Sequence, residues 1–201
     1  MPRPRRRCAA GEVYHLINRG NKKARIFIEA ADYQGFVTAM ADASERTGVR
    51  HMTFCIMPNH FHIVVQSSAD NDISAYMQRL MNAHIRTYQE RHGTKGTGHI
   101  YQGRYRHIQV MTDYQFLNVC RYVDANPLRA GLVDRAEHWL WGGLALKKSR
   151  DGRRLLSPWP VEKPADWLDR VNRQQCEALL NEIRKAIARR RPLDGTDFLQ
   201  L

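Results

Sequence analysis

Residues 50–65 read RHMTFCIMPNHFHIVV, in which two apolar runs stand on either side of Pro58 and Asn59. Proline and asparagine are turn formers, and runs rich in β-branched and aromatic residues around a short turn are typical of an antiparallel hairpin. This stretch therefore predicts a strand over residues 50–57, a tight turn, and a second strand over residues 60–67.

The second strand carries two histidines separated by one phenylalanine. Successive side chains of a strand point to opposite faces, so His60 and His62 share one face while Phe61, Ile63 and Val65 share the other. We expect the apolar face to pack against covering helices. The two imidazoles then lie on the open face of the sheet, where a ligand or an additional helix could sit.

The segments around the hairpin predict the rest of the fold. Apolar residues with helical spacing and runs rich in strand formers alternate along the chain. We predict a strand at 13–17, a helix at 31–47, the hairpin, a helix at 72–91 and a strand at 99–111. This order is the ferredoxin-like βαββαβ arrangement, an α+β fold in which two helices cover one face of an antiparallel sheet. A further helix follows, with Asp113 in the position of an N-cap.

The length of 201 residues suits one domain with additional segments at its ends. We predict this domain over residues 1–135, with residues 1–10 as a mobile basic arm. Residues 136–201 are predicted to form a basic C-terminal extension with a helix near 173–190. Tryptophans, prolines and basic residues alternate there without a steady period.

The net charge of +12 and the pI near 10.0 indicate a polyanionic partner. Nucleic acid is the simplest such partner, although a membrane surface also attracts positive charge. No apolar run approaches the roughly 20 residues that a spanning helix needs. We therefore expect no membrane partner and a location in the cytoplasm, associated with the nucleoid.

The histidine pair has two interpretations when it is considered alone. Two imidazoles on one strand face can hold a divalent ion, which needs a third ligand and supporting contacts. They can equally be hydrogen-bonded side chains without a metal.

Residues 113–133, DYQFLNVCRYVDANPLRAGLV, extend the set of polar candidates. Tyr122 and Asn126 are four residues apart and are therefore neighbours on a helix surface. Pro127 restricts the residue before it, so the helix ends there or Asn126 caps a short helix that begins at Pro127. For the tyrosine, ordinary packing is the alternative to a chemical role.

Three motifs together resemble a known family. The stretches MPNHFHIVV, HIYQGRYRHIQV and RYVDANPLRAGLV look like the REP-associated tyrosine transposases, a branch of the single-tyrosine HUH transposases. The two histidines of the HUH signature correspond to His60 and His62. The Tyr-x-x-x-Asn-Pro string of the branch corresponds to Tyr122, Asn126 and Pro127. The resemblance extends over roughly residues 3–195.

The resemblance implies a catalytic mechanism. Tyr122 would be the nucleophile, and His60, His62 and Asn126 would hold a divalent metal, Mg²⁺ or Mn²⁺. The enzyme would cleave and rejoin single-stranded DNA at hairpin, REP-like sequences through a 5′-phosphotyrosine intermediate. Asp124 departs from the usual string, where relatives carry a less acidic segment; it would tune metal affinity or phenol acidity, or be solvated.

Basic and polar side chains are candidates for contacts with DNA. We predict that these are Arg3, Arg5, Arg6, Arg7, Arg19, Asn21, Arg104 and Arg106, with Tyr101 or Tyr105 available for base stacking. The expected partners are single-stranded and hairpin DNA, bound by a monomer or a homodimer. A non-catalytic or domesticated DNA-binding protein on the same fold is the alternative function. A replication or mobilisation initiator usually adds a helicase or primase domain, for which we see no room.

Overall fold

The four strands form one antiparallel sheet. The computed structural model describes residues 8–147, 155–189 and 191. The strands are β1 (Val13–Arg19), β2 (Arg50–Met57), β3 (His60–Gln66) and β4 (Arg106–Val110), arranged in the order β2-β3-β1-β4. This is the ferredoxin-like order, so the predicted α+β fold is confirmed.

The predicted hairpin lies at one edge of this sheet. Met57 pairs with His60 across the turn, and the antiparallel pairing extends to Arg50 opposite Gln66 with one register shift between His51 and Thr53. Phe61, Ile63 and Val65 are fully buried in the core cluster beneath the helices, as the alternation predicts. His62 points to the opposite face.

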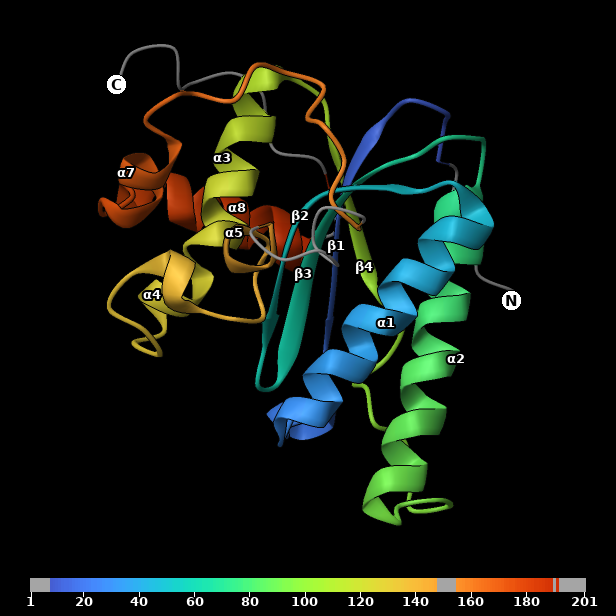
Figure 1. Cartoon of the computed structure of the whole chain (residues 1–201). Helices are drawn as coiled ribbons and strands as arrows, with labels where there is room; N and C mark the ends of the chain where they lie inside the picture. Colours follow the sequence, from blue (N-terminus) through green and yellow to red (C-terminus); the bar gives the residue numbers. More distant parts are fainter. Residues whose placement is uncertain (1–7, 148–154, 190, 192–201) are drawn as a thin grey trace.

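Two long helices cover the apolar face of the sheet. They are α1 (Ala30–Thr47) and α2 (Asp72–His92), which lie side by side in Figure 1. Buried side chains such as Phe36, Met40, Tyr76 and Leu80 join the strands in one cluster. Gly48 ends α1 with a φ of 76°, a left-handed conformation that glycine adopts without steric cost.

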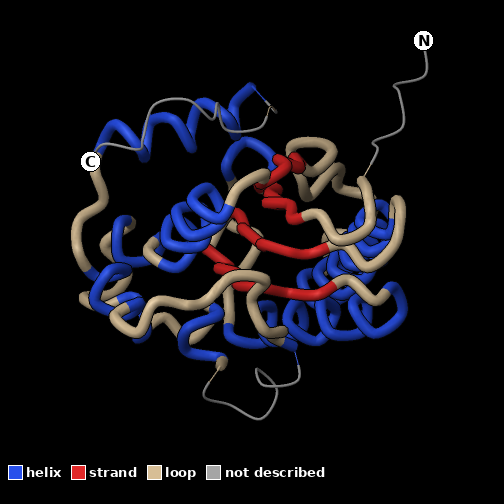
Figure 2. The backbone as a smooth tube through the Cα atoms, turned by 90° about the horizontal axis from the view of Figure 1, so that it is seen from above, coloured by secondary structure: helices blue, strands red, loops and turns tan. Residues whose placement is uncertain are grey.

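The face expected to be open carries a second helical layer. It consists of α3 (Asp113–Asp124), the short α4 (Asn126–Arg129), α7 (Trp167–Asn172) and α8 (Glu177–Arg189), and Figure 2 shows the strands between helices on both sides. Short segments η1 (Asn21–Lys23), η2 (Ala136–His138) and α5 (Gly143–Leu146) complete the described elements. Thr112 rather than Asp113 caps α3, because its hydroxyl accepts the N–H of Gln115.

The fourth strand is shorter than the predicted 99–111, and the prediction is wrong for residues 99–105. Those residues form a loop held to the end of β1, where the Gln102 N–H donates to the Arg19 carbonyl at 2.9 Å. The Tyr101 ring turns into the core and its hydroxyl lies 2.5 Å from Nδ1 of His84. Tyr101 forms only an isolated bridge, to Gly20, and the regular pairing with β1 begins at Arg106.

Residues 136–147 and 155–189 pack along β2, α3 and β4. Three indole N–H groups make the attachment: Trp139 donates to the Ile56 carbonyl, Trp159 to the Met52 carbonyl, and Trp167 to the Asp124 carboxylate, at 2.8–3.0 Å. The predicted helix near 173–190 corresponds to α8. Within the described ranges, no helix combines the length and the apolar character needed to cross a bilayer.

Candidate active site

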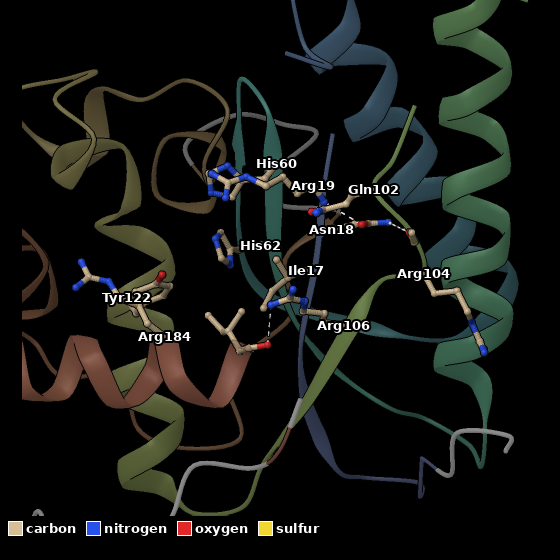
Figure 3. Close-up of a pocket in the computed structure, with 12 residues that line it drawn as sticks. Ile17, Asn18, Arg19, His60, His62, Gln102, Arg104, Arg106, Tyr122 and Arg184 are labelled. Carbon is tan, nitrogen blue, oxygen red and sulfur yellow. Dashed lines mark hydrogen bonds between the residues drawn. The ribbon is translucent and has the colours of Figure 1, made fainter. Parts of the chain in front are cut away.

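A cavity of about 450 Å³ opens on the face of the sheet opposite α1 and α2. It is lined by His60 and His62 of β3 and by Tyr122 of α3, although His62 and Tyr122 are 60 positions apart in sequence. Figure 3 shows Tyr122 and the two histidine rings on one side of the cavity and Arg104 on the other. Three of the four side chains predicted to act in catalysis are therefore brought together.

Hydrogen bonds orient both histidine rings. Nδ1 of His60 lies 2.6 Å from Oδ1 of Asn59, and Nδ1 of His62 lies 2.9 Å from Nε2 of His15. The centroids of the His60 and His62 rings are 5.0 Å apart. Because Nδ1 of each ring is engaged, Nε2 is the atom that each can direct towards an ion.

Burial keeps these imidazoles neutral. Desolvation, with repulsion from Arg19, lowers the pKa of His60 to about 4. Desolvation also holds the pKa of His62 well below its usual value, and neighbouring His60 and His15 lower it further. Neutral imidazole is the form that binds a metal, so this donor set fits a divalent ion at neutral pH.

Tyr122 lies next to the second histidine. Its ring is edge-on to that of His62, with the centroids 5.6 Å apart, and only 8% of the residue is exposed. The guanidinium of Arg129 stacks on the ring, with Cζ 4.3 Å from the ring centroid. The phenol thus contacts both His62 and Arg129 and also borders the cavity.

Asn126 lies one turn further along the chain. Helix α3 ends at Asp124, and a short helix α4 follows as predicted, with Pro127 in its first turn. The prediction that Asn126 caps this helix is wrong, because Ala125 is the N-cap and Asn126 is the first helical residue. Asn126 is buried and does not line the cavity that holds the histidines. Its role as the third metal ligand stays a prediction.

Several predicted DNA contacts line the same cavity. Arg19, Arg104 and Arg106 belong to its wall, and Nη1 of Arg106 donates to the Ile187 carbonyl of α8 at 2.9 Å. Asn21 is exposed in η1 and is not a lining residue. Four further candidates fall outside the described residues, namely Arg3, Arg5, Arg6 and Arg7.

The sequence did not single out three residues that contact this site: His15, Arg129 and Arg184. Arg184 reaches the cavity from α8, and its guanidinium pairs with Glu177 at 2.6 Å. The helical pattern of residues 173–190 predicts α8 but not the surface on which it packs. Only for His15 was there a signal, because it lies in the predicted strand 13–17 next to the hairpin.

Asp124 is not solvated, so that reading of the sequence is wrong. The residue is 4% exposed and accepts hydrogen bonds from the Thr53 hydroxyl and, at 3.0 Å, from Nε1 of Trp167. Burial raises the pKa of Asp124 to about 6. The carboxylate joins α3 to β2 and α7, and it does not line the cavity beside Tyr122.

A second group of potential metal ligands lies on the other face of the sheet. Glu29, Asp32 and His92 meet where α1 begins and α2 ends. Asp32 accepts the Ile28 N–H at 2.8 Å and pairs with Nε2 of His92 at 2.9 Å, and Arg91 lies 3.5–3.6 Å from both carboxylates. These contacts describe a helix cap with an ion-pair network.

Comparison with known proteins gives information on the family and the fold. The family model described as "Transposase IS200 like" matches residues 9–126. No curated protein matches the sequence. One similar solved structure is a REP-associated tyrosine transposase bound to a REP hairpin, with a TM-score of 0.58, 18% identity, and coverage of 81% of this chain and 92% of that one. Another, described as a candidate transposase from Deinococcus radiodurans R1, has a TM-score of 0.44, 16% identity and coverage of 62% and 96%.

Proposed function

Because this chain belongs to the IS200-like transposase family, we propose that it cleaves and rejoins single-stranded DNA through a covalent bond to Tyr122. The observation that carries the proposal is the position of Tyr122 beside two neutral histidines in a cavity walled by arginines. A nucleophile, a pair of metal ligands and a binding surface for phosphates are thereby adjacent. Together these three features support strand transfer at a phosphodiester by a metal-assisted tyrosine nucleophile.

We propose that His60 and His62, with Asn126 as the third ligand, hold Mg²⁺ or Mn²⁺. The available Nε2 atoms and the low pKa of both histidines support this assignment. Two imidazoles and an amide suit Mn²⁺ better than Mg²⁺, which prefers oxygen ligands. The bound ion would supply Lewis-acid polarisation of a phosphoryl oxygen.

The side chains of this protein would perform the remaining steps. Arg19, Arg104 and Arg106 would hold the phosphates of the strand along the cavity. The phenol oxygen of Tyr122 would form a bond to phosphorus as the bond from phosphorus to the 3′-oxygen breaks. The phenol gives up its proton to solvent and the released 3′-oxygen takes one up, which leaves a 5′-phosphotyrosine and a 3′-hydroxyl. The reverse reaction with another 3′-hydroxyl rejoins the strand without an external energy source.

Hairpin DNA of the REP type is the target that we propose. The net charge of +12 favours a polyanion, and a solved structure of similar fold is bound to a REP hairpin. The unpaired strand beside the hairpin would enter the cavity.

The test is incubation of the full chain with hairpin-bearing single-stranded DNA and Mn²⁺ or Mg²⁺, followed by denaturing electrophoresis. We expect a protein–DNA adduct that is lost in Tyr122→Phe, on chelation, and in the double variant His60→Ala with His62→Ala. Tyr114→Phe, which alters an exposed tyrosine of the same helix, is the matched control and should retain the adduct. Hairpin binding without any adduct under either metal would instead identify a non-catalytic DNA-binding protein.

A further inference from the structure

The side chain of Arg129 holds two different parts of Tyr122. Its Nη2 donates to the Tyr122 backbone carbonyl at 2.6 Å, and its Cζ lies 4.3 Å from the centroid of the phenol ring. A guanidinium above an aromatic face attracts the ring electrostatically. One side chain therefore restrains both the backbone and the ring of the proposed nucleophile.

Gln175 holds the guanidinium of Arg129 by a further hydrogen bond. Nη1 of Arg129 donates to Oε1 of Gln175 at 3.0 Å, and Gln175, only 4% exposed, lies between α7 and α8. Two hydrogen bonds to separate segments fix the plane of the guanidinium. The position of the ring consequently depends on a contact between residues 46 apart in sequence.

The Tyr122 ring has a second neighbour in the site. Its plane is nearly perpendicular to that of His62, with 5.6 Å between the ring centroids. The phenol thus contacts both a proposed metal ligand and a fixed cation. In-line attack on phosphorus requires accurate placement of the nucleophilic oxygen, and restraint of the ring by these contacts supplies that accuracy.

We propose that Arg129, braced by Gln175, is a positioning residue that holds the Tyr122 ring in its attacking orientation. This inference rests on the proposed function of Tyr122 as the nucleophile. Arg129 does not line the cavity of His60 and His62, so it acts through Tyr122 and not on the DNA.

The kinetic test measures single-turnover adduct formation on hairpin DNA with Mn²⁺, together with the Kd for the same DNA. We expect Arg129→Gln to lower the rate at saturating DNA by about a hundredfold while the Kd is unchanged. Arg129→Lys keeps the charge and should lose less, and millimolar guanidinium should partly restore Arg129→Ala. Gln175→Ala should slow the reaction, and combined with Arg129→Ala it should add little to the loss from Arg129→Ala alone.

Two controls separate positioning from general damage. Val171→Ala removes buried packing in the same apolar cluster but no hydrogen bond to Arg129, and below its melting temperature it should keep the native rate. Arg170→Gln removes an exposed charge that pairs with Asp166, and it should change neither rate nor Kd. The proposal would be overturned if Arg129→Gln reacted at the native rate, whether its Kd were unchanged or raised. It would also be overturned if Val171→Ala lowered the rate as much as Arg129→Gln does.

A spectroscopic measurement makes the result independent of catalysis. In protein labelled with 3-fluorotyrosine, the ¹⁹F resonance of Tyr122 is identified by its loss in Tyr122→Phe. We expect Arg129→Ala to shift this resonance towards that of a freely rotating ring. If the native protein forms no adduct but the resonance shifts, the proposed function fails, and only the restraint of the ring by Arg129 stands. An unchanged resonance refutes positioning whatever the activity.

Discussion

Nε2 of His15 lies 2.9 Å from Nδ1 of His62, although the two residues are 47 positions apart in sequence. They come from adjacent antiparallel strands, β1 and β3. Burial lowers the pKa of His15 to about 3, so its ring is neutral. If Nδ1–H of His62 donates to His15, the Nε2 lone pair of His62 is available for a metal ion.

Replacement of His15 should therefore weaken metal binding. We expect His15→Leu to lower Mn²⁺ affinity by about 10–100-fold, because His62 loses the acceptor that orients it. His15→Gln retains an acceptor and should lose less. Electron paramagnetic resonance during Mn²⁺ titration measures the affinity. His51→Leu is the control, since this histidine is equally buried but lies 2.7 Å from Tyr76 Oη within the α1 and α2 side of the core. Equal affinities for native protein and His15→Leu would contradict this role.

The free energy of unfolding should fall steeply below pH 6.5. Burial lowers the pKa of His51 to about 3 and that of His84 to about 4, against 6.5 in the unfolded chain. The unfolded state therefore binds more protons between these values, and stability is lost as the pH falls through this window. As the pH falls from 6.5 to 4, each histidine lowers the free energy of unfolding by about 3 kcal/mol. Asp124 acts in the opposite direction, because its pKa of about 6 in the folded state favours folding at lower pH.

Urea unfolding of the chelated protein at pH 5 and pH 7.5 measures this dependence. In His51→Gln we expect a smaller difference between the two pH values than in the native protein. An equal difference in the two proteins would show that His51 is not held neutral by burial.

The hydrogen bond from Trp167 to Asp124 should stabilise the protein more at high pH than at low pH. Trp167→Phe keeps an aromatic ring but removes the donor, which costs about 1–3 kcal/mol where a buried acceptor loses its partner. Because the pKa of Asp124 is about 6, the carboxylate is charged at pH 8 and neutral at pH 5. We expect the larger loss at pH 8. Trp159→Phe removes a bond to the uncharged Met52 carbonyl, so its loss should be the same at both pH values.

Arg104 should bind the phosphate backbone. It is exposed, lines the cavity on the side away from Tyr122, and can reach a strand that enters there (Figure 3). We expect Arg104→Gln to weaken hairpin binding for all sequences alike and to reduce the slope of log Kd against log salt by about one. Fluorescence anisotropy at several salt concentrations tests this. Arg46→Gln, on α1 and paired with Asp42, should leave the slope as it is in the native protein.

The local pattern of residues was sufficient for much of the fold. The apolar alternation around Phe61 predicts a hairpin whose strands agree with β2 and β3 within one residue, and the helical periods predict α1 and α2. The same alternation places His60 and His62 on one face of the sheet. Strand periodicity is a property of neighbouring residues, so no distant contact is needed to read it.

The sites that the sequence missed all depend on contacts between distant segments. Residues 99–105 contain strand-forming side chains, but they form a loop in which the hydroxyl of Tyr101 is hydrogen-bonded to His84. From the sequence, the carboxylate of Asp124 could be solvated on a helix surface. In the structure it is bonded to the Trp167 indole, which belongs to α7. The periodicity of the sequence predicts neither His84 as the partner of Tyr101 nor Trp167 as the partner of Asp124.

The sequence by itself determined the order of strands and helices, the common face of His60 and His62, and the resemblance on which the proposed role of Tyr122 rests. The tertiary structure alone decided which side chains surround them: His15 behind His62, Arg129 on the Tyr122 ring, and Arg184 at the cavity wall. The physical reason is that periodicity specifies the face on which a side chain lies. The partner it meets there depends on how the sheet, α3 and α8 pack together.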